Sequence, residues 1–211
     1  MIGWTVTVAG QTVPQDGFII STDWTPMSSH AHIMPVSPQD YLEGEKTAQV
    51  RHEYVAGRVF ALAGGSQSHN LINGNLLYAL KTHLRGGACK VFVNDLKVEA
   101  KANEVYYYPD LMVTCDPSDD GEYVKKRPVL IVEILSPSTE TTDRREKWVH
   151  YQRLETLREY VLVSQDARRV EVFRRAGDAW DVETFEGDET VNLDSVGVRV
   201  GMGEVYEGVM A

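Results

Sequence analysis

One carboxylate lies in a run of sequence that is otherwise entirely apolar. The run is Pro128–Leu135, and Glu133 is its only charged residue. Continuous apolar runs of this length are typical of central strands that are covered on both faces of a sheet. Because a buried charge is costly unless it is paired or bound to a metal, we expect Glu133 to have a partner inside the protein.

A second acid, Asp110, follows Pro109 within another strand-like run, residues 106–115. Two acids that lie beside apolar sequence on neighbouring strands suggest a site for a divalent cation, because Mg²⁺ takes oxygen ligands and keeps several waters. Such a cation activates water and stabilises charge that builds on a phosphate. The alternative is that Glu133 is paired with a lysine or hydrogen-bonded to a helix start. Alternation along the strand places Glu133 and Leu135 on one face, whereas the face of Asp110 is not fixed by the sequence.

Two other polar residues could belong to the same site. Asp95 precedes Asp110 on the preceding strand-like run and could supply another acid ligand. His69 lies near the start of a predicted helix, just after Gly64–Gly65, where free N–H groups suit a phosphate and an imidazole could move a proton. The alternative for His69 is an exposed position behind a serine that caps the helix.

The elements that must position these residues follow from periodicity and turn residues. A capping serine and a proline predict a short helix over 37–46, and Ala56–Gly57 predicts a hairpin turn. Helical spacing predicts a longer helix over 68–84. We expect a single domain over 37–211 and a poorly ordered extension over 1–36. The remaining expected elements are strands over 90–100, 105–115, 129–135, 159–164 and 169–173, a helix over 141–154, and β hairpins towards the C-terminus. This order predicts an α+β (mixed α/β) layer fold, with a mixed sheet flanked by helices.

Composition restricts the classes of function. The formal net charge of −10 argues against broad, charge-driven binding to nucleic acid, but it does not exclude a nuclease with a local basic surface. No apolar stretch approaches the length of a membrane span, and the first residues do not resemble a secretory signal. We therefore expect a cytoplasmic protein with no membrane partner, in which Cys89 and Cys115 stay reduced.

An ordered set of these residues resembles a known family, the Uma-two family of bacterial endonucleases in the PD-(D/E)XK nuclease superfamily. The likeness runs from about Pro38 through Arg175, and the motifs that carry it are Tyr-Pro-Asp110, Val-Glu133, Ser136–Thr139, Asp143–Lys147 and Tyr151. The resemblance implies a restriction-endonuclease-like core, with Asp110 and Glu133 as metal ligands. It also suggests that Glu53, in the first hairpin, approaches the site; the alternative for Glu53 is a surface carboxylate.

The chain departs from the superfamily at one position. The superfamily usually has a lysine two residues after the metal-binding glutamate, and this chain has Leu135 there. Lys147, on the helix that follows, is the first candidate to replace that lysine, and Lys97 is the second. The alternatives are that Lys147 is an ordinary helix lysine paired with Asp143 and that Lys97 faces solvent.

Together these observations predict an Mg²⁺- or Mn²⁺-dependent endonuclease that hydrolyses phosphodiester bonds in DNA and acts as a homodimer. The catalytic candidates are Asp110, Glu133, Lys147, Lys97, Glu53 and His69, and the candidate metal ligands are Asp110, Glu133 and Asp95. Two other functions stay open. The missing lysine and the acidic charge favour a module that binds nucleic acid or protein without cleaving, and a closed pocket would favour a hydrolase of small molecules.

Overall fold

The computed structural model describes residues 7–8, 11–12, 35–137 and 139–209 of the chain. Contacts divide the chain into two compact units, Met1–Ile33 and Met34–Ala211. In the first unit, β1 (Thr7–Val8) pairs with β2 (Gln11–Thr12). Most of the extension predicted over 1–36 lies outside the described residues. All other described elements belong to the second unit, and no helix among the described residues is both long and apolar enough to cross a membrane.

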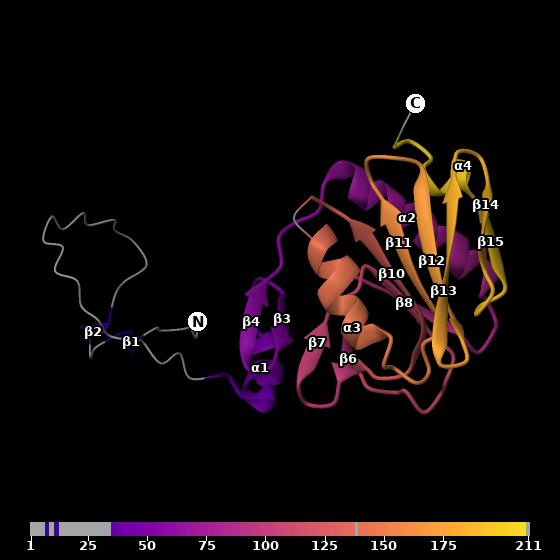
Figure 1. Cartoon of the computed structure of the whole chain (residues 1–211). Helices are drawn as coiled ribbons and strands as arrows, with labels where there is room; N and C mark the ends of the chain where they lie inside the picture. The colour runs from indigo at the N-terminus through magenta and orange to yellow at the C-terminus, as the bar shows by residue number, and fades with distance from the viewer. Residues whose placement is uncertain (1–6, 9–10, 13–34, 138, 210–211) are drawn as a thin grey trace, which may run out of the picture. The chain divides into compact units, whose positions relative to one another are not determined.

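A six-stranded mixed sheet forms the centre of the second unit (Figure 1). Its central pair, β10 (Pro128–Leu135) and β11 (Glu159–Ser164), is parallel, and every other neighbouring pair is antiparallel. The strand order is β13 (Ala179–Glu186), β12 (Arg169–Ala176), β11, β10, β8 (Leu111–Thr114) and β5 (Lys90–Val93). The apolar run around Glu133 is therefore a central strand, as its composition predicts.

The two faces of this sheet pack against different elements. One face packs on α2 (Gln67–His83), on the hairpin of β14 (Thr190–Leu193) and β15 (Val198–Gly201), and on α4 (Met202–Val205). The other face packs on a π-helical turn, η1 (Thr142–Lys147), that continues into α3 (Trp148–Tyr151). The alternation along β10 places Ile131 and Leu135 in this second core, so Glu133 faces the same side.

A second, five-stranded sheet lies beside α3 (Figure 1). Its order is β4 (Arg58–Ala61), β3 (His52–Val55), β7 (Val105–Tyr107), β6 (Lys97–Lys101) and β9 (Val124–Lys125). The hairpin of β3 and β4 turns at Ala56 and Gly57, which both have positive φ, as a two-residue hairpin turn requires. Helix α1 (Pro38–Glu45) begins after Ser37, whose side chain accepts a hydrogen bond from the Asp40 N–H.

Two runs that the sequence presents as single strands are divided between the sheets. Residues 90–100 form β5 in one sheet and β6 in the other, with Asn94 in the left-handed region at φ 52° between them. Residues 105–115 form β7 and β8, separated at Tyr108–Asp110, where Pro109 cannot donate to a strand ladder. Asp110 therefore lies where the chain passes from one sheet to the other.

The expectation of reduced cysteines is wrong, because Cys89 and Cys115 form a disulfide. They are 26 residues apart in sequence, but the antiparallel register that pairs Lys90 with Thr114 places them side by side at the end of β5 and β8. The sequence shows no pairing signal because strand register is not readable from spacing alone.

We expect reduction of this disulfide to lower the free energy of unfolding by about 3 kcal/mol, because the bond closes a loop of intermediate length in the unfolded chain. Urea unfolding with and without a reductant measures the change. The Cys89→Ser/Cys115→Ser variant is the control, and its stability should not respond to the reductant. Equal stability of the wild-type protein in both conditions would contradict the expectation.

Candidate active site

The register between β8 and β10 brings Asp110 and Glu133 together. Leu111 pairs with Val132, so the next pair along the ladder places Asp110 opposite Glu133. The Asp110 N–H lies 3.4 Å from Glu133 Oε2, and Asp110 Oδ2 accepts a hydrogen bond of 2.7 Å from the Ile134 N–H. The two carboxylates are therefore neighbours on one side of the central sheet, held partly by backbone groups of each other's strands.

Lys147 lies on the other side of Glu133, inside a cage of three carboxylates. Its Nζ is 3.1 Å from Glu133 Oε1, from Glu53 Oε1 and from Asp143 Oδ1. Tyr151 donates a hydrogen bond of 3.0 Å to Glu133 Oε1. The two oxygens of Glu133 thus face different groups: Oε1 faces the ammonium and the phenol, and Oε2 faces Asp110.

Burial makes the charges of this cage interdependent. Burial raises the pKa of Glu133 well above its usual range, and it also raises the pKa of Glu53, although Lys147 opposes both shifts. Burial alone would lower the pKa of Lys147, but Glu133, Glu53 and Asp143 outweigh it and raise the pKa well above its usual range. The surrounding carboxylates therefore favour the charged form of Lys147, whereas burial favours the neutral forms of Glu133 and Glu53.

His69 joins the site from the start of α2. Its Nε2 lies 3.1 Å from Asp110 Oδ2, and this contact raises the pKa of His69, although burial opposes the shift. Ser66 caps the helix by accepting a hydrogen bond from the His69 N–H. A Cβ on Gly65 would lie 2.9 Å from His69 Nδ1, so any larger residue at this position would force the His69 ring to shift. The sequence offers two alternatives for this region, a role for His69 in the site or a serine cap with His69 exposed. In the structure Ser66 caps the helix and His69 also contacts Asp110.

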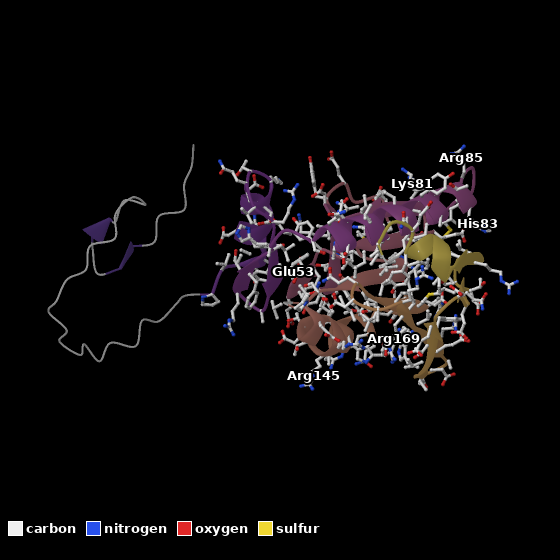
Figure 2. The ribbon with its side chains drawn as sticks, turned by 90° about the horizontal axis from the view of Figure 1, so that it is seen from above. Glu53, Lys81, His83, Arg85, Arg145 and Arg169 are labelled. Carbon is white, nitrogen blue, oxygen red and sulfur yellow. A yellow bond between two sulfur atoms is a disulfide. The ribbon has the colours of Figure 1, made fainter. Side chains whose placement is uncertain are left out.

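The site opens at Asp110 and His69. Their side chains are 18% and 17% exposed, whereas those of Glu53, Glu133, Asp143 and Lys147 are at most 9% exposed. Glu53, on β3, lies in the interior of the second unit (Figure 2). Asp110 and His69 therefore form the more exposed part of the site, and the cage around Lys147 is the more buried part.

The structure places the other two candidates elsewhere. Lys97 is buried, but its Nζ donates to the Tyr108 hydroxyl at 3.0 Å, and that hydroxyl donates to Glu45. The carboxylate of Asp95 is 76% exposed and pairs with Arg51 at 3.3 Å. Neither side chain contacts Asp110 or Glu133 among the described residues. Lys97 reaches the site only through the backbone, since the Tyr108 N–H donates to Glu53.

Asp143 and Tyr151 belong to the site but were not among the predicted site residues. They stand four residues before and after Lys147, so all three side chains lie on one side of the η1–α3 segment. That spacing is visible in the sequence, where Asp143–Lys147 is one of the motifs of the family resemblance and an ordinary helix ion pair is the alternative interpretation. What the sequence does not show is that this side of the segment faces Glu133.

Within the part of the chain that the structure describes, the basic side chains labelled in Figure 2 do not lie together around the site. Lys81, His83 and Arg85 lie at the C-terminal end of α2, and Arg145 and Arg169 lie on the opposite side of the molecule (Figure 2). Several arginines are already paired with acids; for example, Arg144 contacts Glu140 and Glu171, and Arg169 contacts Glu171 and Glu186.

The donor set at Asp110 and Glu133 fits a hard divalent cation. Asp110 Oδ1 accepts no hydrogen bond from the described residues, and Glu133 Oε2 accepts only the long contact from the Asp110 N–H. Within the described part of the chain, no group of three or more His, Cys, Asp or Glu side chains is arranged to hold a metal ion. Mg²⁺ is compatible with this, because it is commonly held by one or two carboxylates and keeps several waters.

Comparisons with known proteins give a consistent result. A family model, Uma2, described as "Putative restriction endonuclease", matches residues 38–202. Two proteins of Synechocystis sp. are similar to this chain. The protein slr1290 is 33% identical over 189 residues, which cover 87% of this chain and 99% of the relative. The protein sll1609 is 32% identical over 142 residues, which cover 66% of this chain and 80% of the relative. A crystal structure of a "putative nuclease belonging to DUF820" from Anabaena variabilis has a TM-score of 0.68 at 16% identity, and the match covers 83% of this chain and all of that one. That likeness supports the same mixed α/β fold.

Proposed function

Because the chain belongs to the Uma2 family of restriction-endonuclease-like proteins, we propose that it is a metal-dependent endonuclease that hydrolyses phosphodiester bonds in DNA. The single observation that carries the proposal is the convergence of Asp110 and Glu133. Asp110 lies at the open side of the site and its Oδ1 accepts no hydrogen bond from the described residues, and the buried Glu133 Oε2 accepts only the long contact from the Asp110 N–H. We also propose that it acts as a homodimer, since C2 dimers are the commonest oligomers. The disulfide of Cys89 and Cys115 argues against the cytoplasmic location expected from the sequence, because disulfides are rare in cytosolic proteins.

Asp110 and Glu133 would hold Mg²⁺ or Mn²⁺, which when bound supplies an activated water and stabilises charge on the phosphate. Lys147 fixes the rotamer of Glu133 through their contact at 3.1 Å and adds positive charge behind the metal ligands. Lys147 lies on the far side of Glu133 from Asp110. It therefore supplies the positive charge of the lysine that the superfamily usually has at the position of Leu135, but it does not contact the substrate.

His69 is placed to move a proton at the mouth of the site. Its ring is partly exposed and its Nε2 contacts Asp110, so the imidazole lies beside one of the two carboxylates that would hold the metal. This contact also holds the Asp110 carboxylate in one orientation, with Oδ2 turned towards His69 and the Ile134 N–H.

Cleavage of supercoiled plasmid DNA tests the proposed function. Incubation with Mg²⁺ or Mn²⁺ should give nicked and linear products, and chelation of the metal should prevent them. The Glu133→Ala variant, purified in the same way, controls for a contaminating nuclease. Binding of DNA without cleavage in either metal would instead support the non-catalytic module.

We expect the His69→Ala variant to cleave DNA about 10²-fold more slowly than the wild-type protein, because it loses the proton-transferring group. His83→Ala is the matched control, since His83 lies exposed at the other end of α2 (Figure 2). Initial rates under saturating metal measure the effect. Equal rates for the His69 and His83 variants would show that His69 has no part in catalysis.

A further inference from the structure

Helix α2 carries a buried asparagine one turn after His69, and the proposed mechanism does not use it. Asn73 is four residues after His69, so the two side chains lie on the same side of the helix. Asn73 is 4% exposed, and its Nδ2 donates a hydrogen bond of 2.8 Å to Asn94 Oδ1. Its own Oδ1 is buried and has no hydrogen-bond partner among the described residues. One half of this amide is therefore paired and the other half is not.

The stability of the fold does not account for this asparagine. An acceptor that is buried without a partner destabilises a protein, whereas leucine has the same branched shape and no polar atoms. Asn94 is exposed, so water would satisfy its side chain if Asn73 were apolar. Buried polar atoms without a partner are rare in native proteins, and each calls for a specific explanation. The explanation therefore lies in what the contact between Asn73 and Asn94 achieves.

Asn94 lies at the point where the chain leaves one sheet for the other. It separates β5 from β6 and has φ 52°, a left-handed conformation that costs energy for a residue with a side chain. In this conformation its N–H donates a hydrogen bond of 3.0 Å to the Asp110 carbonyl. The crossing from β5 to β6 is therefore bonded to the crossing from β7 to β8, and the bond is made at Asp110.

Helix α2 thus holds Asp110 at two points. His69 contacts the Asp110 carboxylate at 3.1 Å, and Asn73 supports the Asp110 backbone through Asn94. We propose that Asn73 is a positioning residue for Asp110, because it holds Asn94 in the conformation that binds the Asp110 backbone. The Asp110 carboxylate then stays 2.7 Å from the Ile134 N–H. The consequence for metal binding rests on the proposed function, whereas the positioning of Asp110 does not.

Hydrogen exchange of single amides, measured by NMR on the metal-free protein, tests the positioning. The Ile134 N–H reports on the Asp110 carboxylate, and the Asn94 N–H reports on the Asp110 backbone. In Asn73→Leu we expect both amides to exchange about tenfold faster, the effect of losing one hydrogen bond. The other amides of β10 and β11 should keep their wild-type rates, because only a local opening becomes easier. A purely structural role would instead accelerate all amides of the central sheet together.

Asn75→Leu is the matched control, because Asn75 also lies on α2 but donates to backbone carbonyls in and after α4. It should leave the Ile134 and Asn94 amides unchanged. Asn94→Gly permits the left-handed conformation but lacks the contact with Asn73, so it should accelerate exchange of the Ile134 amide as much as Asn73→Leu does. The double variant Asn73→Leu/Asn94→Gly should show no greater effect than either single variant, as expected for two residues that act through one contact.

The Mn²⁺ affinity of the same variants separates this proposal from the proposed function. We expect Asn73→Leu to bind Mn²⁺ about tenfold more weakly than the wild-type protein, as for the loss of a group that orients a metal ligand, and Asn75→Leu to bind it equally well. Selective acceleration of the Ile134 and Asn94 amides in a protein that binds no Mn²⁺ would support the positioning and remove the metal from the proposed function. Unchanged exchange at both amides in Asn73→Leu, equal acceleration of all amides of β10 and β11, or additive effects in the double variant would overturn the proposal.

Discussion

The Asp110→Asn variant should lose metal-dependent cleavage of DNA by a factor of about 10³, the loss expected when one preorganised electrostatic group is removed from a catalytic site. Asparagine has the same shape as aspartate, and its carbonyl oxygen can still accept the hydrogen bond that Asp110 Oδ2 takes from the Ile134 N–H at 2.7 Å. The fold should therefore be unchanged. What is lost is the negative charge of the more exposed of the two proposed metal ligands.

Asp95→Asn is the matched control for this substitution. Asp95 lies 15 positions before Asp110 in the chain, is largely exposed and pairs with Arg51, so its neutralisation should leave the rate within about twofold of the wild-type protein, as for a surface change. Initial rates of plasmid cleavage and melting temperatures of both variants give the comparison. Similar losses in the two variants would show that Asp110 has no special role, and would favour long-range charge effects instead.

The second large effect concerns Lys147. Replacing it by methionine keeps most of the volume but leaves three acids without their cation, which should lower the free energy of unfolding by about 3–5 kcal/mol. Cleavage should also fall strongly, because Glu133 loses the contact that fixes its orientation. Urea unfolding in the absence of divalent metal measures the stability, and plasmid cleavage measures the activity.

Two further variants separate stability from catalysis. Lys147→Met/Glu53→Gln/Asp143→Asn should recover most of the lost stability, since two of the three uncompensated charges are removed, but it should not recover cleavage. Lys97→Met removes an equally buried lysine from outside the cage and should keep cleavage within about tenfold of the wild-type rate. Recovery of activity in the triple variant, or a greater loss in Lys97→Met than in Lys147→Met, would contradict the roles assigned to these lysines.

Local signals in the sequence predict much of the fold. The apolar run around Glu133 is β10, the Ala56–Gly57 turn joins β3 and β4, and the capping residues at Ser37 mark the start of α1. These predictions are confirmed because each of the three elements is determined by residues that are neighbours in the chain. The mixed α/β class and the family also follow, since both depend on the order of such elements.

The features that the sequence does not predict depend on tertiary contacts. Nothing local distinguishes Lys147, which enters a buried cage, from Lys97, which bonds to a tyrosine. The division of residues 105–115 between two sheets decides where Asp110 lies, yet only Pro109 hints at it. The disulfide of Cys89 and Cys115 depends on strand register, which becomes visible only once the sheet is formed.

The most direct test of the account is a crystal structure of the protein with Mn²⁺, using the anomalous signal of the metal to locate it. The account predicts a peak within coordination distance of both Asp110 Oδ1 and Glu133 Oε2, with Lys147 still in place between Glu53, Glu133 and Asp143. A peak elsewhere, or no peak at a concentration of Mn²⁺ that supports cleavage, would contradict it.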